Sequence, residues 1–134
     1  NDLEKLVEAL RVMKAAAEAR DVPAFVQSDV DFHGALLLAT GNKALQDLVG
    51  ALGKELIPER AATLDIVGRL PRSFAEHTAI YDAIRQGDSR AAELAMHRHL
   101  EGVRRDVFEH LLGDAAIDPK SHVSDEPPSV AEQS

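Results

Sequence analysis

Apolar residues recur three and four positions apart through most of the chain, and this spacing predicts helices rather than strands. The first helix is expected to start at Asn1 or Asp2, either of which can cap it. Its apolar positions are Leu3, Leu6, Val7, Leu10, Met13 and Ala17. No alternating, β-branched segment of useful length interrupts the pattern. The sequence therefore predicts an all-α fold, with its helices packed around one core.

Capping residues, prolines and glycines predict where the next helices begin and end. Asp21 followed by Pro23 is typical of a helix start, and Gly41 is expected to end that helix in the left-handed conformation. A third helix is expected to kink or end near Pro58. Its apolar positions are Leu45, Leu48, Val49, Leu52 and Leu56. Residues 59–70 remain unassigned, because Gly68 and Pro71 bracket a weakly periodic stretch.

The second half of the chain predicts two further helices and a tail. One helix carries Phe74, Ile80 and Ile84 and should end at Gly87. Asp88 then caps the last helix, whose apolar positions are Ala92, Ala95, Leu100, Val103, Val107 and Leu111. From Gly113 onward, prolines, serines and acidic residues replace the apolar pattern, which is typical of a flexible tail. We therefore expect a folded domain over residues 1–112 and a tail over residues 113–134.

Charge and cysteine content exclude several classes of function. The 134 residues include 15 Lys and Arg against 23 Asp and Glu, a formal net charge of −8. Such a surface repels phosphate groups, so neither nucleic acid nor membrane is an expected partner of this segment by itself. The absence of cysteine excludes disulfides and thiolate metal sites. No run resembles a membrane span or a signal peptide, so the cytoplasm is the expected compartment.

Four polar residues interrupt the apolar faces of the predicted helices. Asp29 and His33 lie one helical turn apart and share a face. His77 lies between Phe74 and Ile80 on an inward stripe, and the spacing of His99 from Ala95 and Val103 also points it inward. Taken singly, each histidine is more simply a core residue bonded to a backbone carbonyl or a serine, and Asp29 could pair with one of them. Together, the four satisfy one another most simply by sharing a cation.

Imidazole nitrogens and a carboxylate oxygen are suitable ligands for zinc, and also for nickel, manganese or ferrous iron. We therefore expect one divalent metal ion, with zinc as the first choice. The competing interpretation is an ion pair between Asp29 and one histidine, with the other histidines incidental.

Two segments resemble the FCD domain, the effector-binding domain of the FadR subfamily of GntR transcription regulators. Residues 29–42, DVDFHGALLLATGN, resemble the family motif D-x-x-F-H…T-G-N. Residues 76–100, EHTAIYDAIRQGDSRAAELAMHRHL, resemble its pattern E-H-x-x-I-x-x-A-I…G-D-x-x-A-A…H-L. The resemblance covers about residues 1–110, nearly the whole of the predicted helical part.

The resemblance implies an antiparallel helical bundle with a metal in its central cavity. The ligands of metal-binding members fall on Asp29, His33, His77 and His99, whereas His97 is expected to be a solvated bystander. The family's winged-helix DNA-binding domain has no counterpart here, and we expect the first helix of its effector domain to be unmatched in this chain as well. DNA would therefore be reached only through a domain outside this chain, within a homodimer.

The resemblance also implies an organic acid such as lactate, citrate or a sugar acid as the effector. A small carboxylate or hydroxy acid could occupy coordination positions that four protein ligands leave open. A guanidinium could hold its other end, and Arg60 and Arg72 are the candidates. For both, the plainer interpretation is a solvated surface arginine.

Two other classes of function compete with a sensor. A metal-dependent enzyme is possible in principle, but the chain has neither an H-E-x-x-H motif nor the paired Glu-x-x-His helices of di-iron bundles. Glu76, adjacent to His77, is expected to point away and to make a poor general base. A helical interaction module without a ligand would require the four inward polar residues to be accidental.

Overall fold

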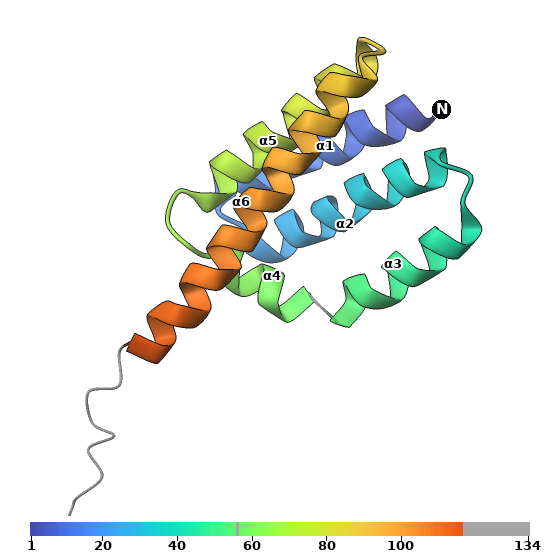
Figure 1. Ribbon diagram of the computed structural model, residues 1–134. Coiled ribbons are helices and arrows are strands. Elements are labelled where there is room, and N and C mark those ends of the chain that lie inside the picture. The colour runs from blue at the N-terminus through green and yellow to red at the C-terminus, as the bar shows by residue number, and fades with distance from the viewer. Residues whose placement is uncertain (56, 117–134) are drawn as a thin grey trace, which may run out of the picture.

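The computed structural model describes residues 1–55 and 57–116, and most of these residues lie in helices (Figure 1). The helices are α1 (Asp2–Ala19), α2 (Val22–Ala39), α3 (Lys43–Glu55), α4 (Ile57–Leu64), α5 (Arg69–Arg85) and α6 (Ser89–Ala116). No strand occurs in the described residues, and the all-α prediction is confirmed. Within the same ranges, no helix combines the length and the hydropathy that crossing a bilayer requires.

Two helical hairpins make up the bundle. Helix α1 packs along α2, α5 packs along α6, and contacts between α1 and α5 join the pairs (Figure 1). Helix α3 lies along the outer side of α2, and α4 packs against α2, α5 and α6. The C-terminal part of α6 extends beyond the other helices (Figure 1). This arrangement brings the middle of α2, α5 and α6 close to α4.

Local capping chemistry sets the helix ends where the sequence predicts them. The Asp21 carboxylate accepts a hydrogen bond from the backbone N–H of Ala24 at 3.1 Å, and Asp88 accepts one from Ala91 at 2.9 Å. Each bond satisfies an N–H group that has no partner within the helix, a contribution of about 1 kcal/mol. Helix α2 ends just before Gly41, whose φ of 67° is accessible to glycine without strain.

The unassigned stretch forms a short helix and a turn. Pro58 does not lie within the third helix but is the second residue of α4, where a missing N–H removes no helical hydrogen bond. The expected position Leu56 lies outside the described residues. Gly68, with a φ of 78°, then directs the chain into α5.

The last helix is longer than the sequence indicates. It continues through Gly113 to Ala116, beyond the predicted boundary at residue 112. The remainder of the predicted tail, residues 117–134, lies outside the described residues.

The apolar core lies mainly between α1, α2 and α5. Met13, Phe25 and Phe32 are fully buried there, and Ile80 is 1% exposed. Burial of each such side chain contributes about 1.5–3 kcal/mol. Helix α6 turns polar residues inward instead, with both His99 and Asp106 buried. The bundle is therefore apolar on its α1 side and polar where α2, α5 and α6 meet.

Several apolar residues of the predicted stripes lie at the surface. Val7 is 46% exposed, Leu48 is 57% exposed and Leu100 is 56% exposed. Helical spacing predicted their helices correctly but did not determine which edge of each apolar face would be covered.

Candidate metal centre

Three helices bring together the four predicted metal ligands. Helix α2 supplies Asp29 and His33 from adjacent turns, α5 supplies His77 and α6 supplies His99. One ligand atom from each lies within 4.8 Å of the other three. Two ligands about 2.2 Å from one zinc ion can be at most about 4.4 Å apart, so small side-chain shifts would fit the set to one ion.

The closest contacts join Asp29, His33 and His77. His77 Nε2 lies 2.7 Å from Asp29 Oδ1 and 3.1 Å from His33 Nε2. His33 Nε2 lies 3.3 Å from the same carboxylate oxygen. The His99 ring stacks on His33 with 5.4 Å between ring centroids, and Phe32 contacts His77 edge-on at 5.0 Å. The ligand atoms thus lie close together, and Phe32 packs against the His77 ring.

Hydrogen bonding determines which nitrogen of His77 faces this point. His77 Nδ1 lies 2.7 Å from the backbone carbonyl of Ser73, so it carries the hydrogen and donates it. In the neutral ring, Nε2 then has a lone pair and faces a carboxylate oxygen, which also accepts. Two acceptors at 2.7 Å repel each other unless they share a proton or bind the same metal ion. The geometry therefore suits a metal ion.

Burial disfavours the protonated, cationic form of the three histidines. Burial lowers the pKa of His77 to about 3, and the neighbouring His33 lowers it further. Burial also lowers the pKa values of His33 and His99 to about 4. All three rings are therefore neutral near pH 7, which is the form that coordinates metals.

Glu76 has a role that the sequence analysis missed. Its carboxylate lies 2.7 Å from His99 Nδ1, so that nitrogen donates to it and Nε2 is left free to bind a metal. Burial by itself would raise the pKa of Glu76, but hydrogen bonds from Arg69 and His99 outweigh this effect and lower it. The sequence analysis considered Glu76 only as a general base beside His77 and did not foresee its contact with His99.

A buried arginine holds Glu76 in place. Arg69 is 2% exposed, and its Nη1 lies 2.9 Å from Glu76 Oε1 while its Nε lies 2.6 Å from Asp106 Oδ2. The two carboxylates come from α5 and α6, so Arg69 ties these helices together beside His99. Arg69 and Glu76 are seven residues apart, two turns along one face of α5, and this spacing is the signal that could have predicted the pair.

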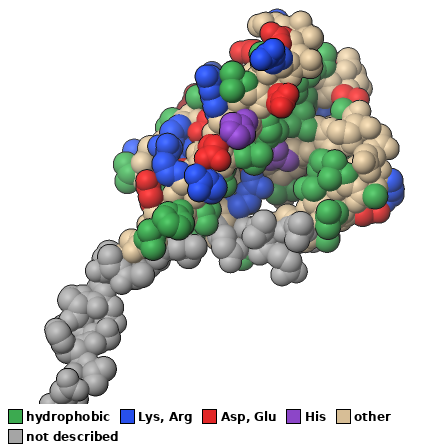
Figure 2. Space-filling view, viewed as in Figure 1, with side chains coloured by type: hydrophobic (Ala, Val, Ile, Leu, Met, Phe, Trp, Pro, Cys, Tyr) green, Lys and Arg blue, Asp and Glu red, His purple; other side chains and the backbone are tan. Residues whose placement is uncertain are grey.

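Charged side chains of both signs are interspersed along the outer surface of α6 (Figure 2).

Glycine at position 102 gives Glu76 room. A Cβ atom at Gly102 would lie 3.1 Å from Glu76 Oε1, closer than normal contact. Glycine at this position of α6 therefore leaves space for the carboxylate that orients His99.

We expect Glu76→Gln to weaken Zn²⁺ binding about tenfold, because the amide keeps a hydrogen-bond acceptor but loses the charge that supports His99. Competition against a chromophoric chelator measures this change. Glu101→Gln is the matched control, because Glu101 is exposed and its ion pair among the described residues is with Arg104, one turn along the same helix. Equal affinities for wild type and Glu76→Gln would contradict the assigned role.

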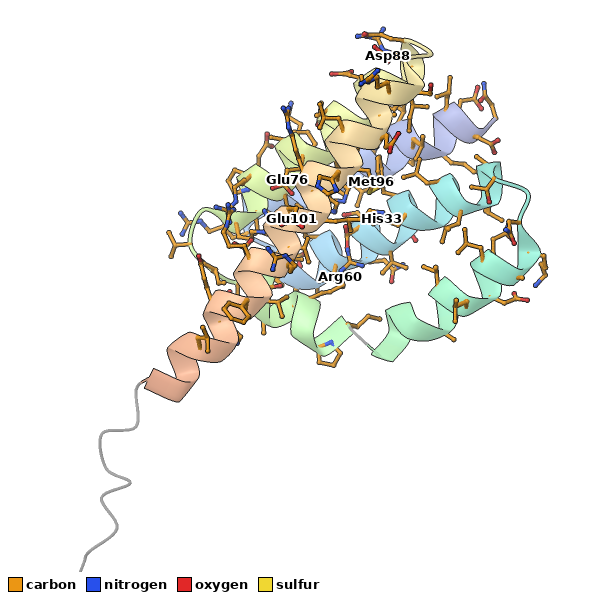
Figure 3. All side chains as sticks on the ribbon, viewed as in Figure 1. His33, Arg60, Glu76, Asp88, Met96 and Glu101 are labelled. Atoms are coloured by element: carbon orange, nitrogen blue, oxygen red, sulfur yellow. The ribbon has the colours of Figure 1, made fainter. Side chains whose placement is uncertain are left out.

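The two predicted effector arginines occupy different environments. Arg60 reaches from α4 to form an ion pair with Asp29 Oδ2, an oxygen that is buried and has no hydrogen bond of normal geometry (Figure 3). Arg72 is half-exposed and pairs instead with Asp106, 3.0 Å away. His97 is exposed and lies outside the cluster, as expected.

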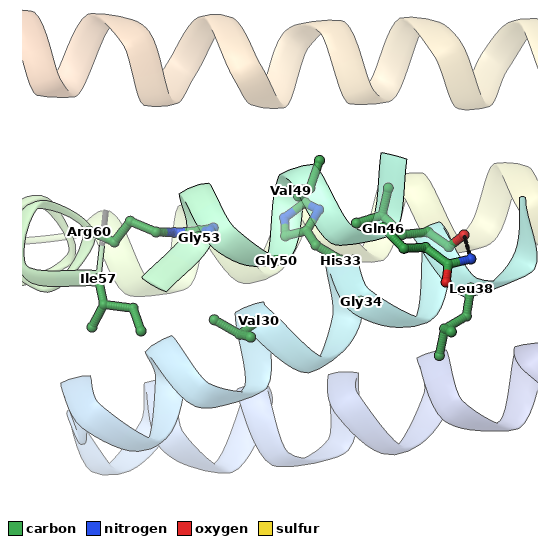
Figure 4. A pocket seen from close by; sticks show the side chains of 11 residues that line it. Val30, His33, Gly34, Leu38, Gln46, Val49, Gly50, Gly53, Ile57 and Arg60 are labelled. Atoms are coloured by element: carbon green, nitrogen blue, oxygen red, sulfur yellow. Dashed lines mark hydrogen bonds between the residues drawn. The ribbon is translucent and has the colours of Figure 1, made fainter. Parts of the chain in front are cut away.

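Two hollows adjoin the cluster. A small cavity of about 20 Å³ is bordered by Asp29, Arg60, Ser73 and His99, enough for one water molecule or ion. A larger pocket of about 350 Å³ lies between α2, α3 and α4 and is bordered by both His33 and Arg60 (Figure 4). Arg72 borders neither. The expected cavity at the bundle centre remains a prediction, since the larger pocket lies at its side.

The chain is similar to known regulators. The model of the FCD domain family matches residues 1–102. The HTH-type transcriptional repressor NanR of Citrobacter rodentium is 35% identical over 113 residues, which is 83% of this chain and 42% of that protein. The galactonate operon transcriptional repressor of Escherichia coli K12 is 35% identical over 97 residues, 71% of this chain and 41% of that protein. The chain thus spans about two fifths of these relatives, and no solved structure matches it.

Proposed function

The chain belongs to the FCD domain family, and we propose that it is the effector-sensing domain of a GntR-type transcription regulator that binds one divalent metal ion and a small organic acid. The observation that carries the proposal is the convergence of Asp29, His33, His77 and His99. Zinc is the preferred metal, with nickel, manganese and iron as alternatives. The repressor names of the relatives favour regulation over catalysis.

The bound metal would supply a Lewis acid with open coordination positions for a carboxylate. His77 and His99 are held for this task by Ser73 and Glu76, which fix the nitrogen that each ring presents. Arg60 forms an ion pair with Asp29 Oδ2 and still has N–H groups that can donate to the acid. A guanidinium beside a metal is therefore the anion-binding feature of the site.

Acid binding would act on DNA binding through a domain outside this chain. The ligand cluster joins α2, α5 and α6, so a metal-bound acid can favour one packing of these helices over another. In a homodimer, that difference would be relayed to DNA-binding domains and would alter their affinity for an operator.

Metal and acid binding can be tested together by elemental analysis and calorimetry. We expect about one metal equivalent per chain after zinc loading, and lactate, citrate or gluconate should bind at least tenfold more weakly after chelation. Less than a tenth of an equivalent after zinc or nickel loading would refute the metal site. Equal acid affinity with and without metal would refute its role in sensing.

We expect Arg60→Met to weaken acid binding about tenfold while metal content is kept, because a charge-assisted hydrogen bond contributes about 1.5–3 kcal/mol. Arg72→Met is the matched control, since that arginine borders neither hollow. Calorimetric titration of both zinc-loaded variants gives the comparison. If Arg72→Met loses acid binding and Arg60→Met keeps it, then Arg72 and not Arg60 binds the acid.

A further inference from the structure

The pocket between α2, α3 and α4 has an uneven chemical lining. Its described walls are formed mainly by Val30, Leu37, Leu38, Val49 and Ile57. His33 and Arg60 contribute the ionisable groups, and both belong to or contact the metal cluster (Figure 4). The Gln46 side-chain NH₂ group already donates to the backbone carbonyl of Leu37 at 3.2 Å. The described lining therefore offers a cation and a metal ligand at one side and mainly hydrocarbon elsewhere.

Three glycines keep this pocket open. Gly34 in α2 and Gly50 and Gly53 in α3 border it, and a Cβ atom at any of them would meet no atom within 4 Å. Their φ angles are negative, so backbone conformation does not require glycine at these positions. A helix with an internal glycine is less stable than the same helix with alanine. The three glycines therefore lower the stability of α2 and α3, and they leave the pocket unfilled.

These observations decide between two kinds of organic acid. A sugar acid would place several hydroxyl groups against valine, leucine and isoleucine side chains, which offer them no hydrogen bonds. An acid with a hydrocarbon body would bury apolar surface there. We infer that the effector is a monocarboxylate with an apolar body, whose carboxylate lies between the metal and Arg60 and whose body occupies the pocket beside Gly50 and Gly53. This inference rests on the proposed metal-dependent acid site.

Hexanoate and gluconate provide a matched pair of probes, because they have the same carbon-chain length and differ mainly in hydroxyl groups. With the zinc-loaded protein, calorimetry should show hexanoate binding at least tenfold more tightly than gluconate. Equal affinities, or tighter binding of gluconate, would overturn the inference. Absence of zinc binding would instead refute the proposed function, so elemental analysis of each sample separates the two failures.

Filling the pocket provides the second test. Gly53→Leu should weaken hexanoate binding at least tenfold while zinc content and helical circular dichroism stay at wild-type levels. It should also raise the melting temperature, because leucine is a better helix former than glycine. Gly113→Leu is the matched control: Gly113 lies in α6 with open space at its Cβ and does not border the pocket.

The control should raise thermal stability without changing hexanoate affinity. Unchanged hexanoate affinity in a folded, zinc-loaded Gly53→Leu variant would place the acid elsewhere and overturn the inference. If that variant fails to fold, Gly50→Leu fills the same pocket from the preceding turn of α3, and unchanged affinity there would count equally against the pocket.

Discussion

His77→Ala is expected to lower the affinity for Zn²⁺ by about a hundredfold or more. Loss of an outer-shell hydrogen-bond partner already costs 10–100-fold in typical metal sites, and loss of a ligand removes the metal–nitrogen bond itself. His77 is fully buried, and its Nε2 atom has the shortest contact in the cluster, with Asp29 Oδ1.

The measurement is competition for zinc against a chelator of known affinity, with helical circular dichroism as the check on folding. His97→Ala is the matched control, because His97 is an exposed histidine of α6 outside the cluster. It should bind zinc as the wild type does. A folded His77→Ala variant with wild-type affinity would exclude this residue as a ligand.

Removal of the metal is expected to lower thermal stability by on the order of 10 °C. A ligand present at a hundredfold its dissociation constant stabilises the native state by about 2.7 kcal/mol, and 1 kcal/mol corresponds to several degrees for a chain of this size. Without a cation, the acceptor nitrogen of His77 faces the Asp29 carboxylate at 2.7 Å. The metal would remove this repulsion and cross-link three helices.

Melting curves with saturating zinc and with excess chelator provide the measurement. His77→Ala serves again, now as the variant whose melting temperature should respond little to zinc. A wild-type melting temperature that is the same with zinc and with chelator would show that no ion is held between these helices.

The sequence predicted the helix boundaries best where a local rule sets them. Asp21 and Asp88 cap the helices that follow them, and Gly41 adopts the left-handed conformation. Each effect involves groups only a few residues apart, so the printed sequence is sufficient. The stretch around Pro58 was harder, because a proline ends one helix or begins another depending on what its neighbours pack against.

The candidate site was predicted only in part, because spacing within one helix shows which residues share a face but not which residues of other helices they contact. The faces of α2, α5 and α6 turn Asp29, His33, His77 and His99 inward, and helical spacing together with a family resemblance identified all four. Their ability to bind a metal remains a prediction. Spacing could not assign Glu76, because its partner His99 is 23 residues away on another helix. It also could not distinguish Arg60, which reaches Asp29, from Arg72, which pairs with Asp106.

The sequence by itself thus determined the all-α class, most helix ends and the four inward polar residues, because these follow from hydrogen bonds and periodicity within a few residues. Tertiary structure alone decided which stripe edges stay exposed, that Arg69 is buried between two carboxylates, and that the pocket lies beside α3. These features depend on the distances between helices far apart in sequence. An ion pair such as Arg69 with Asp106 exists only because α5 and α6 pack side by side, and no spacing along one helix encodes that contact.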